Sequence, residues 1–284
     1  ERSSNNIAVA FQEDKLTYQE LNEEANNLAT FLHKLGIKQG DFVGICQKRN
    51  TNFLVSILAI LKAGGAYVPI DCTYPPERIK YMLSNSEVKI LLSESSLLNI
   101  FTGNLEDYPN LKSIICLDIH ANNSVETKLA DINIYSQVNV EFIKLTKKSN
   151  SCLLPKGSDR AYMLYTSGST GLPKGAIVRH DGAINHIYAQ FDALNLQEGF
   201  SFLQSAAASS DISVWQFLAP ILRGGRTVIV DTETVCNPEK LFQVIKEEQI
   251  NLVEFVPVVL RGLIDYVSQL SPDRRSLPDL KWMM

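Results

Sequence analysis

A segment rich in glycine, hydroxyl residues and lysine lies in the middle of the chain, directly after an apolar run. It reads Tyr165, Thr166, Ser167, Gly168, Ser169, Thr170, Gly171, Leu172, Pro173, Lys174 and Gly175. Glycines let successive backbone N–H groups point into one concavity. The hydroxyl groups add hydrogen-bond donors and the lysine adds a positive charge, so this segment could hold a polyphosphate.

The spacing of the segment excludes two other functional loops. A Walker A loop needs G-x-x-x-x-G-K-[ST], whereas here Pro173 precedes the lysine and Gly175 follows it. The nucleophile elbow of hydrolases needs G-x-S-x-G, and Ser167 occupies its first glycine position. The remaining alternative is a turn of small residues without a ligand.

The segments that must position this loop alternate between strand-like and helix-like patterns. Strands are expected at 7–11, 42–46, 66–70, 88–92, 113–117, 162–166, 226–230 and 252–256, and helices at 17–35, 53–62, 76–84, 182–193, 213–222 and 238–248. Several strands are continuous apolar runs, which is typical of a parallel sheet covered by helices on both faces. The pattern predicts an α/β fold.

The first helix carries its own start and stop signals. Thr17 and Glu20 have the spacing of a capping box, and Gly36 lies where a C-terminal glycine is expected. The polar stretch 121–158 is interpreted as a variable connection between two βα halves, 1–120 and 159–284. Because the last residues 280–284 begin another apolar strand, we expect a larger parent polypeptide.

Composition and charge exclude several classes of function. The 284 residues include 27 basic and 31 acidic side chains, so no strong basic field is available for nucleic acid. Five cysteines without a CxxC pair argue against a disulfide framework or a zinc site. The four histidines form no constellation and are interpreted as structural or surface residues. No secretory signal is present and no run reaches the roughly 18–20 apolar residues that cross a bilayer, so we expect a cytoplasmic protein without a membrane partner.

The segment 165–175 resembles the phosphate-binding signature of the adenylate-forming superfamily, which includes acyl-CoA synthetases, firefly-type luciferases and the adenylation domains of nonribosomal peptide synthetases. Two more stretches are similar to core motifs of the peptide synthetase branch, namely Leu16-Thr17-Tyr18-Gln19-Glu20-Leu21 and Leu61-Lys62-Ala63-Gly64-Gly65-Ala66-Tyr67-Val68-Pro69-Ile70-Asp71. The similarity extends from about residue 7 to residue 284. It implies the N-terminal large domain of the adenylate-forming fold, with two βα-layered subdomains whose mainly parallel sheets are flanked by helices.

The stretch Ser210-Asp211-Ile212-Ser213-Val214-Trp215 resembles a further motif of this branch, in which the aspartate binds the α-ammonium group of an amino acid. Hydrogen bonds between a carboxylate and an ammonium group are charge-assisted and strong. An acyl-CoA synthetase has no ammonium group to bind, so Asp211 favours the peptide synthetase branch. The family usually has an aromatic residue where this chain has Ser210. The alternative role for Asp211 is to cap the following helix.

The resemblance also places Ile212, Trp215 and Glu254 on positions that line the amino-acid pocket. Glu254 lies between apolar neighbours in a predicted strand, where an unpaired carboxylate needs a partner or a raised pKa. We expect Glu254 to contact a cationic or hydrogen-bond-donating substrate side chain, as in ornithine-, diaminobutyrate- or arginine-like amino acids. The alternatives are a solvent-facing position or a salt bridge to Arg223 or Arg261.

The reaction implied by the resemblance has two steps. An amino-acid carboxylate attacks the α-phosphorus of ATP and releases pyrophosphate, and the phosphopantetheine thiol of a peptidyl carrier domain then takes the aminoacyl group. The implied catalytic residues are Thr166 and Lys174, with Mg²⁺ sharing the phosphate charge. The residues implied to bind the ATP phosphates are Thr166, Ser167, Gly168, Ser169, Thr170, Gly171 and Lys174.

Other parts of the family's machinery do not occur in these 284 residues. They include the aromatic-Gly-Pro-Thr-Glu segment, the ribose-binding aspartate, and the small C-terminal domain with its catalytic lysine, which is not Lys174. We therefore expect weak or no activity from the isolated chain, and a neighbouring condensation domain in a larger synthetase. The alternatives are an acyl- or aryl-acid CoA ligase of the same superfamily and a non-catalytic nucleotide-binding fragment.

Overall fold

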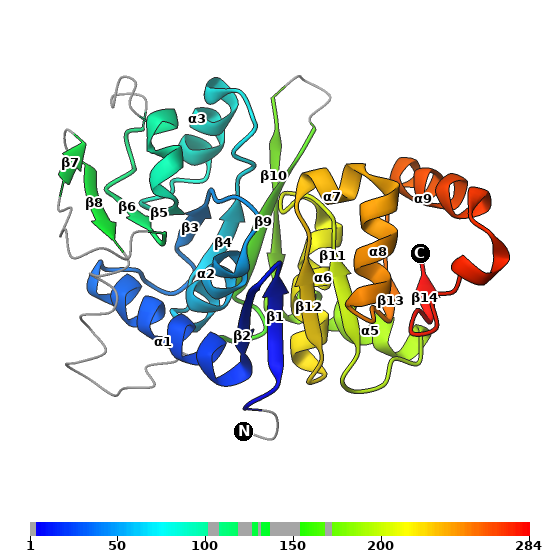
Figure 1. Cartoon of the computed structure of the whole chain (residues 1–284). Helices are drawn as coiled ribbons and strands as arrows, with labels where there is room; N and C mark the ends of the chain where they lie inside the picture. Colours follow the sequence, from blue (N-terminus) through cyan, green and yellow to red (C-terminus); the bar gives the residue numbers. More distant parts are fainter. Residues whose placement is uncertain (1–3, 102–107, 119–126, 130–131, 137–153, 168–171) are drawn as a thin grey trace. The chain divides into compact units, whose positions relative to one another are not determined.

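The computed structural model describes residues 4–101, 108–118, 127–129, 132–136, 154–167 and 172–284 (Figure 1). The chain forms two compact units. Residues 22–185 make one unit, and residues 1–21 together with 186–284 make the other. These bounds differ from the predicted halves 1–120 and 159–284, because the first strand of the chain pairs with a strand near residue 227.

The unit 22–185 contains a sheet that has eight strands in the described part of the chain, in the order β10-β9-β4-β3-β5-β6-β8-β7. Their bounds are β3 Phe42–Ile45, β4 Ala66–Pro69, β5 Ile90–Ser93, β6 Ser113–Cys116, β7 Thr127–Leu129, β8 Ile132–Ser136, β9 Arg160–Thr166 and β10 Lys174–Arg179. The strands from β9 to β8 run parallel, while β10 and β7 are antiparallel to their neighbours.

The other unit contains a sheet with six described strands in the order β14-β13-β11-β12-β1-β2. Their bounds are β1 Ile7–Phe11, β2 Asp14–Thr17, β11 Ser201–Gln204, β12 Arg226–Ile229, β13 Leu252–Val253 and β14 Trp282–Met283. β1 pairs in parallel with β12, with Val9 opposite Thr227, and only β2 is antiparallel to its neighbour among these described strands. The predicted α/β class with mainly parallel sheets is therefore confirmed.

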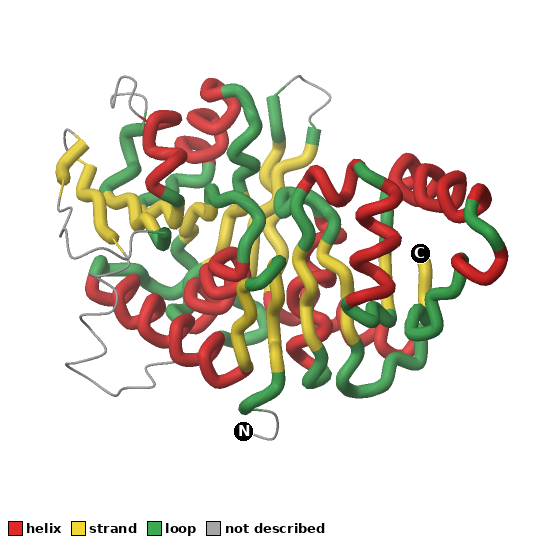
Figure 2. The backbone as a smooth tube through the Cα atoms, viewed as in Figure 1, coloured by secondary structure: helices red, strands yellow, loops and turns green. Residues whose placement is uncertain are grey.

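Helices accompany the strands in both units (Figure 2). They are α1 Tyr18–Lys34, α2 Thr51–Lys62, α3 Pro76–Asn85, α5 His180–Ala193, α6 Asp211–Leu222, α7 Thr232–Cys236, α8 Pro238–Glu247 and α9 Pro257–Gln269, with 3-10 turns at Ser95–Phe101 and Pro272–Arg274. α2 packs on β3 and β4, and α6 packs on β11 and β12. Within the described residues, no helix is long and apolar enough to cross a membrane.

The first helix begins and ends as its sequence predicts. The backbone N–H of Thr17 donates to the Glu20 carboxylate at 2.8 Å, and the N–H of Glu20 donates to the Thr17 hydroxyl at 3.2 Å. At the other end Gly36 has a φ of +88°, and the N–H of Ile37 donates to the carbonyl of Leu32. These bonds form a reciprocal capping box and a Schellman stop.

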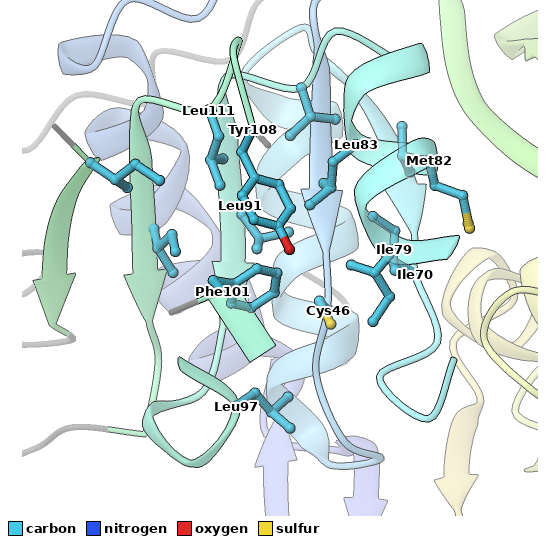
Figure 3. Packing of buried hydrophobic residues seen from close by; sticks show 14 of the residues in the cluster. Cys46, Ile70, Ile79, Met82, Leu83, Leu91, Leu97, Phe101, Tyr108 and Leu111 are labelled. Carbon is cyan, nitrogen blue, oxygen red and sulfur yellow. The ribbon is translucent and has the colours of Figure 1, made fainter. Parts of the chain in front are cut away.

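Each unit is held by apolar clusters of its own. In the unit 22–185, side chains of β5, of α3 and of Cys46, which follows β3, meet beside Phe101 and Tyr108, as Figure 3 shows. In the other unit, Trp215 packs edge-to-face on Phe202, with ring centroids 4.9 Å apart, and both rings are almost fully buried. This second contact matters for function, because it fixes the helix that carries the predicted substrate residues.

Two sequence predictions of local structure are corrected. β7 and β8 lie inside the stretch 121–158, for which no strand is predicted and which is interpreted as a variable connection between two βα halves. They form because Ile132 and Ile134 alternate into the core and β8 pairs with β6. The predicted strand 252–256 ends at Val253. The backbone carbonyl of Glu254 instead accepts a hydrogen bond from a side chain of α6.

Candidate functional site

The predicted phosphate-binding segment connects β9 to β10 at one end of an antiparallel pair. Thr166 and Lys174 are directly opposite each other in this pair, and the Thr166 hydroxyl donates to the Lys174 carbonyl at 3.4 Å. Thr166, Ser167 and Lys174 are exposed, so their polar groups are available to a ligand. The predicted residues 168–171 lie outside the described part of the chain.

Residues next to this segment fix its base. A Cβ atom on Gly175 would lie 2.5 Å from Sδ of Met163, so any larger residue there would displace the Met163 side chain that packs on β10. The Tyr165 hydroxyl donates to Oδ1 of Asn85 in α3 at 2.8 Å, and burial raises the pKa of Tyr165 to about 12. The hairpin therefore leaves the sheet from a rigid and well-packed strand end.

The predicted substrate residues Asp211, Ile212 and Trp215 all lie on α6, in the other unit. α6 begins at Asp211 and Ser210 occupies the N-cap position, so the alternative in which Asp211 caps the helix is wrong. Asp211 is exposed. Its Oδ1 accepts hydrogen bonds from the N–H of Ile212 at 2.9 Å and from the hydroxyl of Ser210 at 3.2 Å.

Trp215 and Glu254, separated by 39 positions in the sequence, are joined by a hydrogen bond. The indole Nε1 of Trp215 donates to Oε2 of Glu254 at 2.7 Å. Trp215 is 2% exposed, whereas Glu254 is half-buried just beyond the end of β13. The predicted pocket residues on α6 and after β13 are thus brought together.

The pKa of Glu254 is raised above its ordinary value, chiefly because burial disfavours the carboxylate. The hydrogen bond from Trp215 lowers the same pKa, the negative charge of Asp211 raises it, and His186 lowers it. Asp211, Glu254 and His186 therefore act electrostatically on one site. The negative charges of Asp211 and Glu254 favour a cationic ligand.

The predicted alternative of a salt bridge between Glu254 and an arginine is not observed. Neither Arg223 nor Arg261 forms an ion pair with Glu254 in the described residues. The Arg223 guanidinium instead lies over the ring of Phe191, 4.6 Å from its centroid. The half-buried Glu254 is thus not neutralised by an arginine.

Sequence reasoning misses two residues near this group. It interprets His186 as a structural or surface residue, yet the charge of His186 affects Glu254. It does not consider Gln216, although this residue is fully buried and its side chain binds the backbone of Glu254. A polar residue between Trp215 and Phe217 in an otherwise apolar helix is the signal that could have identified Gln216.

The predicted phosphate-binding segment and the predicted substrate residue Glu254 each lie beyond the carboxyl end of a parallel strand, where α/β proteins bind ligands. Thr166 ends β9, and Glu254 directly follows β13. A hollow of about 460 Å³ lies at the opposite end of the strands of the six-stranded sheet. It is lined by the first residues of β11 and β12. Within the described residues, no three His, Cys, Asp or Glu side chains gather as a metal site.

An α/β chain with a glycine- and hydroxyl-rich connection after a parallel strand has the features of a nucleotide-binding enzyme. The model of the AMP-binding enzyme family matches residues 1–284. The chain therefore belongs to this family of adenylate-forming ligases, and the predicted superfamily is confirmed.

The similar curated proteins are peptide synthetases. The chain is 38% identical over 265 residues to a polypeptide of the linear gramicidin synthase of Brevibacillus parabrevis. It is 34% identical over 270 residues to gramicidin S synthase 1 of Brevibacillus brevis. These matches cover 93% and 95% of this chain but only 5% and 22% of the relatives. The chain thus spans a small part of the synthetases it resembles.

Solved structures with this fold include the nonribosomal peptide synthetase FmoA3 in a form bound to α-methyl-L-serine-AMP. It matches with a TM-score of 0.75 and 25% identity, covering 98% of this chain and 28% of that one. A putative long-chain-fatty-acid CoA ligase from Rhodopseudomonas palustris matches with a TM-score of 0.77 at 17% identity, covering 96% of this chain and 64% of that one. The second match shows a shared fold alone.

Proposed function

We propose that the chain is the N-terminal portion of an amino-acid adenylation domain in a nonribosomal peptide synthetase. In the proposed reaction an amino-acid carboxylate attacks the α-phosphorus of ATP, the bond to pyrophosphate breaks, and an aminoacyl-adenylate forms. A phosphopantetheine thiol on a peptidyl carrier domain then displaces AMP and becomes a thioester. The relatives in gramicidin synthesis support this proposal.

The phosphate side of the proposed reaction belongs to the hairpin of β9 and β10. Exposed hydroxyl groups of Thr166 and Ser167 and the ammonium group of Lys174 are suited to hold the β- and γ-phosphates and the departing pyrophosphate. The glycines and hydroxyls of 168–171 complete the proposed loop. Mg²⁺ is usually held through substrate phosphates and a few protein oxygens, and hydroxyl oxygens at this strand end fit that role.

The observation that carries the amino-acid part of the proposal is that Glu254, held by Trp215 of α6, is affected by the negative charge of Asp211 at the start of the same helix. Within the described residues, the hydrogen bonds of Asp211 use only Oδ1, so Oδ2 is left for an α-ammonium group. Glu254 then faces a second donor of the substrate. This favours a basic or polar side chain, with Ile212 and Trp215 as apolar walls of the pocket.

Amino-acid-dependent ATP–pyrophosphate exchange tests the proposal in the full parent synthetase. The panel contains basic, polar and aromatic α-amino acids together with their deaminated analogues. We expect exchange with a basic or polar α-amino acid and its loss in Asp211→Ala. Asp192→Ala, which removes an exposed aspartate of α5 in the same unit, serves as the matched control and retains exchange.

Other outcomes contradict the proposal in distinguishable ways. Exchange only with acids that lack the amino group would indicate an acyl- or aryl-acid CoA ligase. ATP binding without exchange for any acid would indicate a nucleotide-binding module. Transfer of the activated amino acid to a purified carrier domain, followed as a radiolabelled thioester, tests the second step separately.

A further inference from the structure

The side chain of Gln216 is fully buried and joins three segments of the unit that contains α6. Its Oε1 accepts from the backbone N–H of Ser205 at 3.1 Å and of Ala206 at 3.0 Å. Its Nε2 donates to the carbonyl of Glu254 at 3.0 Å. One amide of α6 therefore binds the segment that follows β11 and the segment that follows β13.

Neighbouring side chains strengthen this network. The Ser205 hydroxyl also donates to the Glu254 carbonyl, at 3.3 Å, and the Gln204 amide donates to the Ala206 carbonyl at 2.7 Å. Buried backbone groups that lose a partner are costly. The network therefore connects the segments that follow β11 and β13 to each other and to α6.

Glu254 is consequently held at two points by adjacent residues of α6. Trp215 binds its carboxylate, and Gln216 binds its backbone carbonyl. A charged group can select a ligand only when its position is fixed to within roughly half an ångström, and that precision comes from the residues behind it. Packing alone would be served by an apolar side chain, whereas the three hydrogen bonds need an amide.

We propose that Gln216 is a positioning residue for amino-acid selection, which acts by fixing Glu254 and the segment 205–206 relative to α6 without touching the substrate. This inference rests on the proposed function. Because the hydrogen bonds orient the substrate pocket and lie in a unit separate from the Lys174 hairpin, they should affect amino-acid binding more than ATP binding.

The test compares variants of the full synthetase by ATP–pyrophosphate exchange, with KM and kcat measured for the amino acid and for ATP. Gln216→Met keeps the length of the side chain but removes all three hydrogen bonds. We expect KM for the preferred amino acid to rise about tenfold and its preference over a neutral analogue to fall about tenfold. KM for ATP should stay within about twofold.

Two further variants separate positioning from stability. Gln216→Glu keeps an oxygen that accepts from the backbone of Ser205 and Ala206 but loses the N–H that binds the Glu254 carbonyl, so the selectivity should stay low. Thr227→Val is the matched structural control, because the buried Thr227 hydroxyl donates to the Phe217 carbonyl of the same helix at 3.1 Å. It should lower the melting temperature while leaving the substrate preference unchanged.

Gln216→Glu keeps the inference testable if Gln216→Met does not fold. Ser205→Ala tests the same network more mildly, because it removes the 3.3 Å bond from the Ser205 hydroxyl to the Glu254 carbonyl, and it should raise KM for the amino acid about twofold. Unchanged selectivity in a folded Gln216→Met or Gln216→Glu, with wild-type exchange intact, would overturn the role of Gln216 alone. Absence of exchange in the wild-type synthetase would overturn the proposed function and this inference with it.

Discussion

The indole N–H of Trp215 points at the carboxylate of Glu254 and donates a 2.7 Å hydrogen bond to it. Through this bond the buried ring of Trp215 holds the half-buried carboxylate of Glu254, which directly follows the end of β13. One carboxylate oxygen is engaged with the protein, which leaves the other for a ligand. The two residues should therefore behave as a coupled pair in mutational experiments.

Replacing Trp215 by Phe removes this hydrogen bond and keeps most of the packing on Phe202. We expect the free energy of unfolding to fall by about 1–3 kcal/mol, because a half-buried carboxylate loses its donor. Urea denaturation measures the change. Trp282→Phe is the control, since Trp282 is 38% exposed and should change stability by no more than about 0.5 kcal/mol. Equal effects of the two substitutions would contradict a stabilising role of the hydrogen bond.

Glu254→Gln keeps an oxygen for the Trp215 indole but removes the charge. If the substrate side chain is cationic, its kcat/KM in pyrophosphate exchange should fall roughly 30-fold or more. A neutral polar amino acid should change by less than about threefold. If the Glu254→Gln enzyme ranks its substrates as the wild type does, the proposed contact between Glu254 and the substrate side chain is contradicted.

The activity should also depend on pH through Glu254. Burial raises its pKa, with smaller effects of Trp215, Asp211 and His186. As the pH falls, the carboxylate is protonated at a higher pH than an ordinary glutamate, so kcat/KM for a basic amino acid should fall earlier than for a neutral one. Parallel pH profiles for the two substrates would rule out this titration.

The same raised pKa predicts an effect of opposite sign on stability. The folded state holds the Glu254 proton more tightly than the unfolded state does. This contribution is present below the unfolded pKa and is lost as the pH rises through the folded pKa. Glu254→Gln should therefore flatten the decline in stability above the ordinary glutamate range, as measured by urea denaturation across pH.

Gly175→Ala tests the close approach of β10 to β9. The new methyl group would lie 2.5 Å from Sδ of Met163, so we expect a loss of about 1–3 kcal/mol in stability and a higher KM for ATP. The loss should shrink in the background Met163→Ala. Gly182→Ala has its nearest neighbour 3.8 Å away and should stabilise α5 by up to about 1 kcal/mol. Similar results for both glycines would contradict the packing argument.

Lys174→Ala tests the phosphate hairpin directly. Loss of the ammonium group should raise KM for ATP about tenfold or more, because charge-assisted bonds to phosphate are strong. KM for the amino acid should stay within about twofold. Lys156→Ala removes another exposed lysine of the same unit and should leave both constants unchanged; a matching loss in that variant would point to general charge effects.

Much of the fold could be predicted because local signals and burial agree. The capping box at Thr17 and the stop at Gly36 mark α1, and continuous apolar runs mark the parallel strands from β3 to β6. β8 was missed because its alternation of Ile132 and Ile134 is short and lies among polar residues. The pairing of β1 with β12 is a contact between distant segments, and no local pattern encodes it.

The candidate site was predictable in its residue types but not in its connections. A family resemblance predicts that Asp211, Trp215 and Glu254 share one pocket, and in the structure a hydrogen bond joins Trp215 to Glu254. The resemblance could not reveal that Trp215 binds the Glu254 carboxylate or that Gln216 binds its backbone. Such bonds depend on where β13 ends. The Gln216 amide of α6 donates to the carbonyl of Glu254, the first residue after that end.

The parallel pairing of β1 with β12 sets an order of events during synthesis on the ribosome. Residues 22–185 are contiguous in the sequence, whereas β1 can pair with β12 only after residue 227 has been made. At roughly 5–20 residues per second, that wait lasts on the order of 10–40 s. During it the apolar strand Ile7–Phe11 has no native partner on the β12 side, which makes the nascent chain a natural client for a holding chaperone.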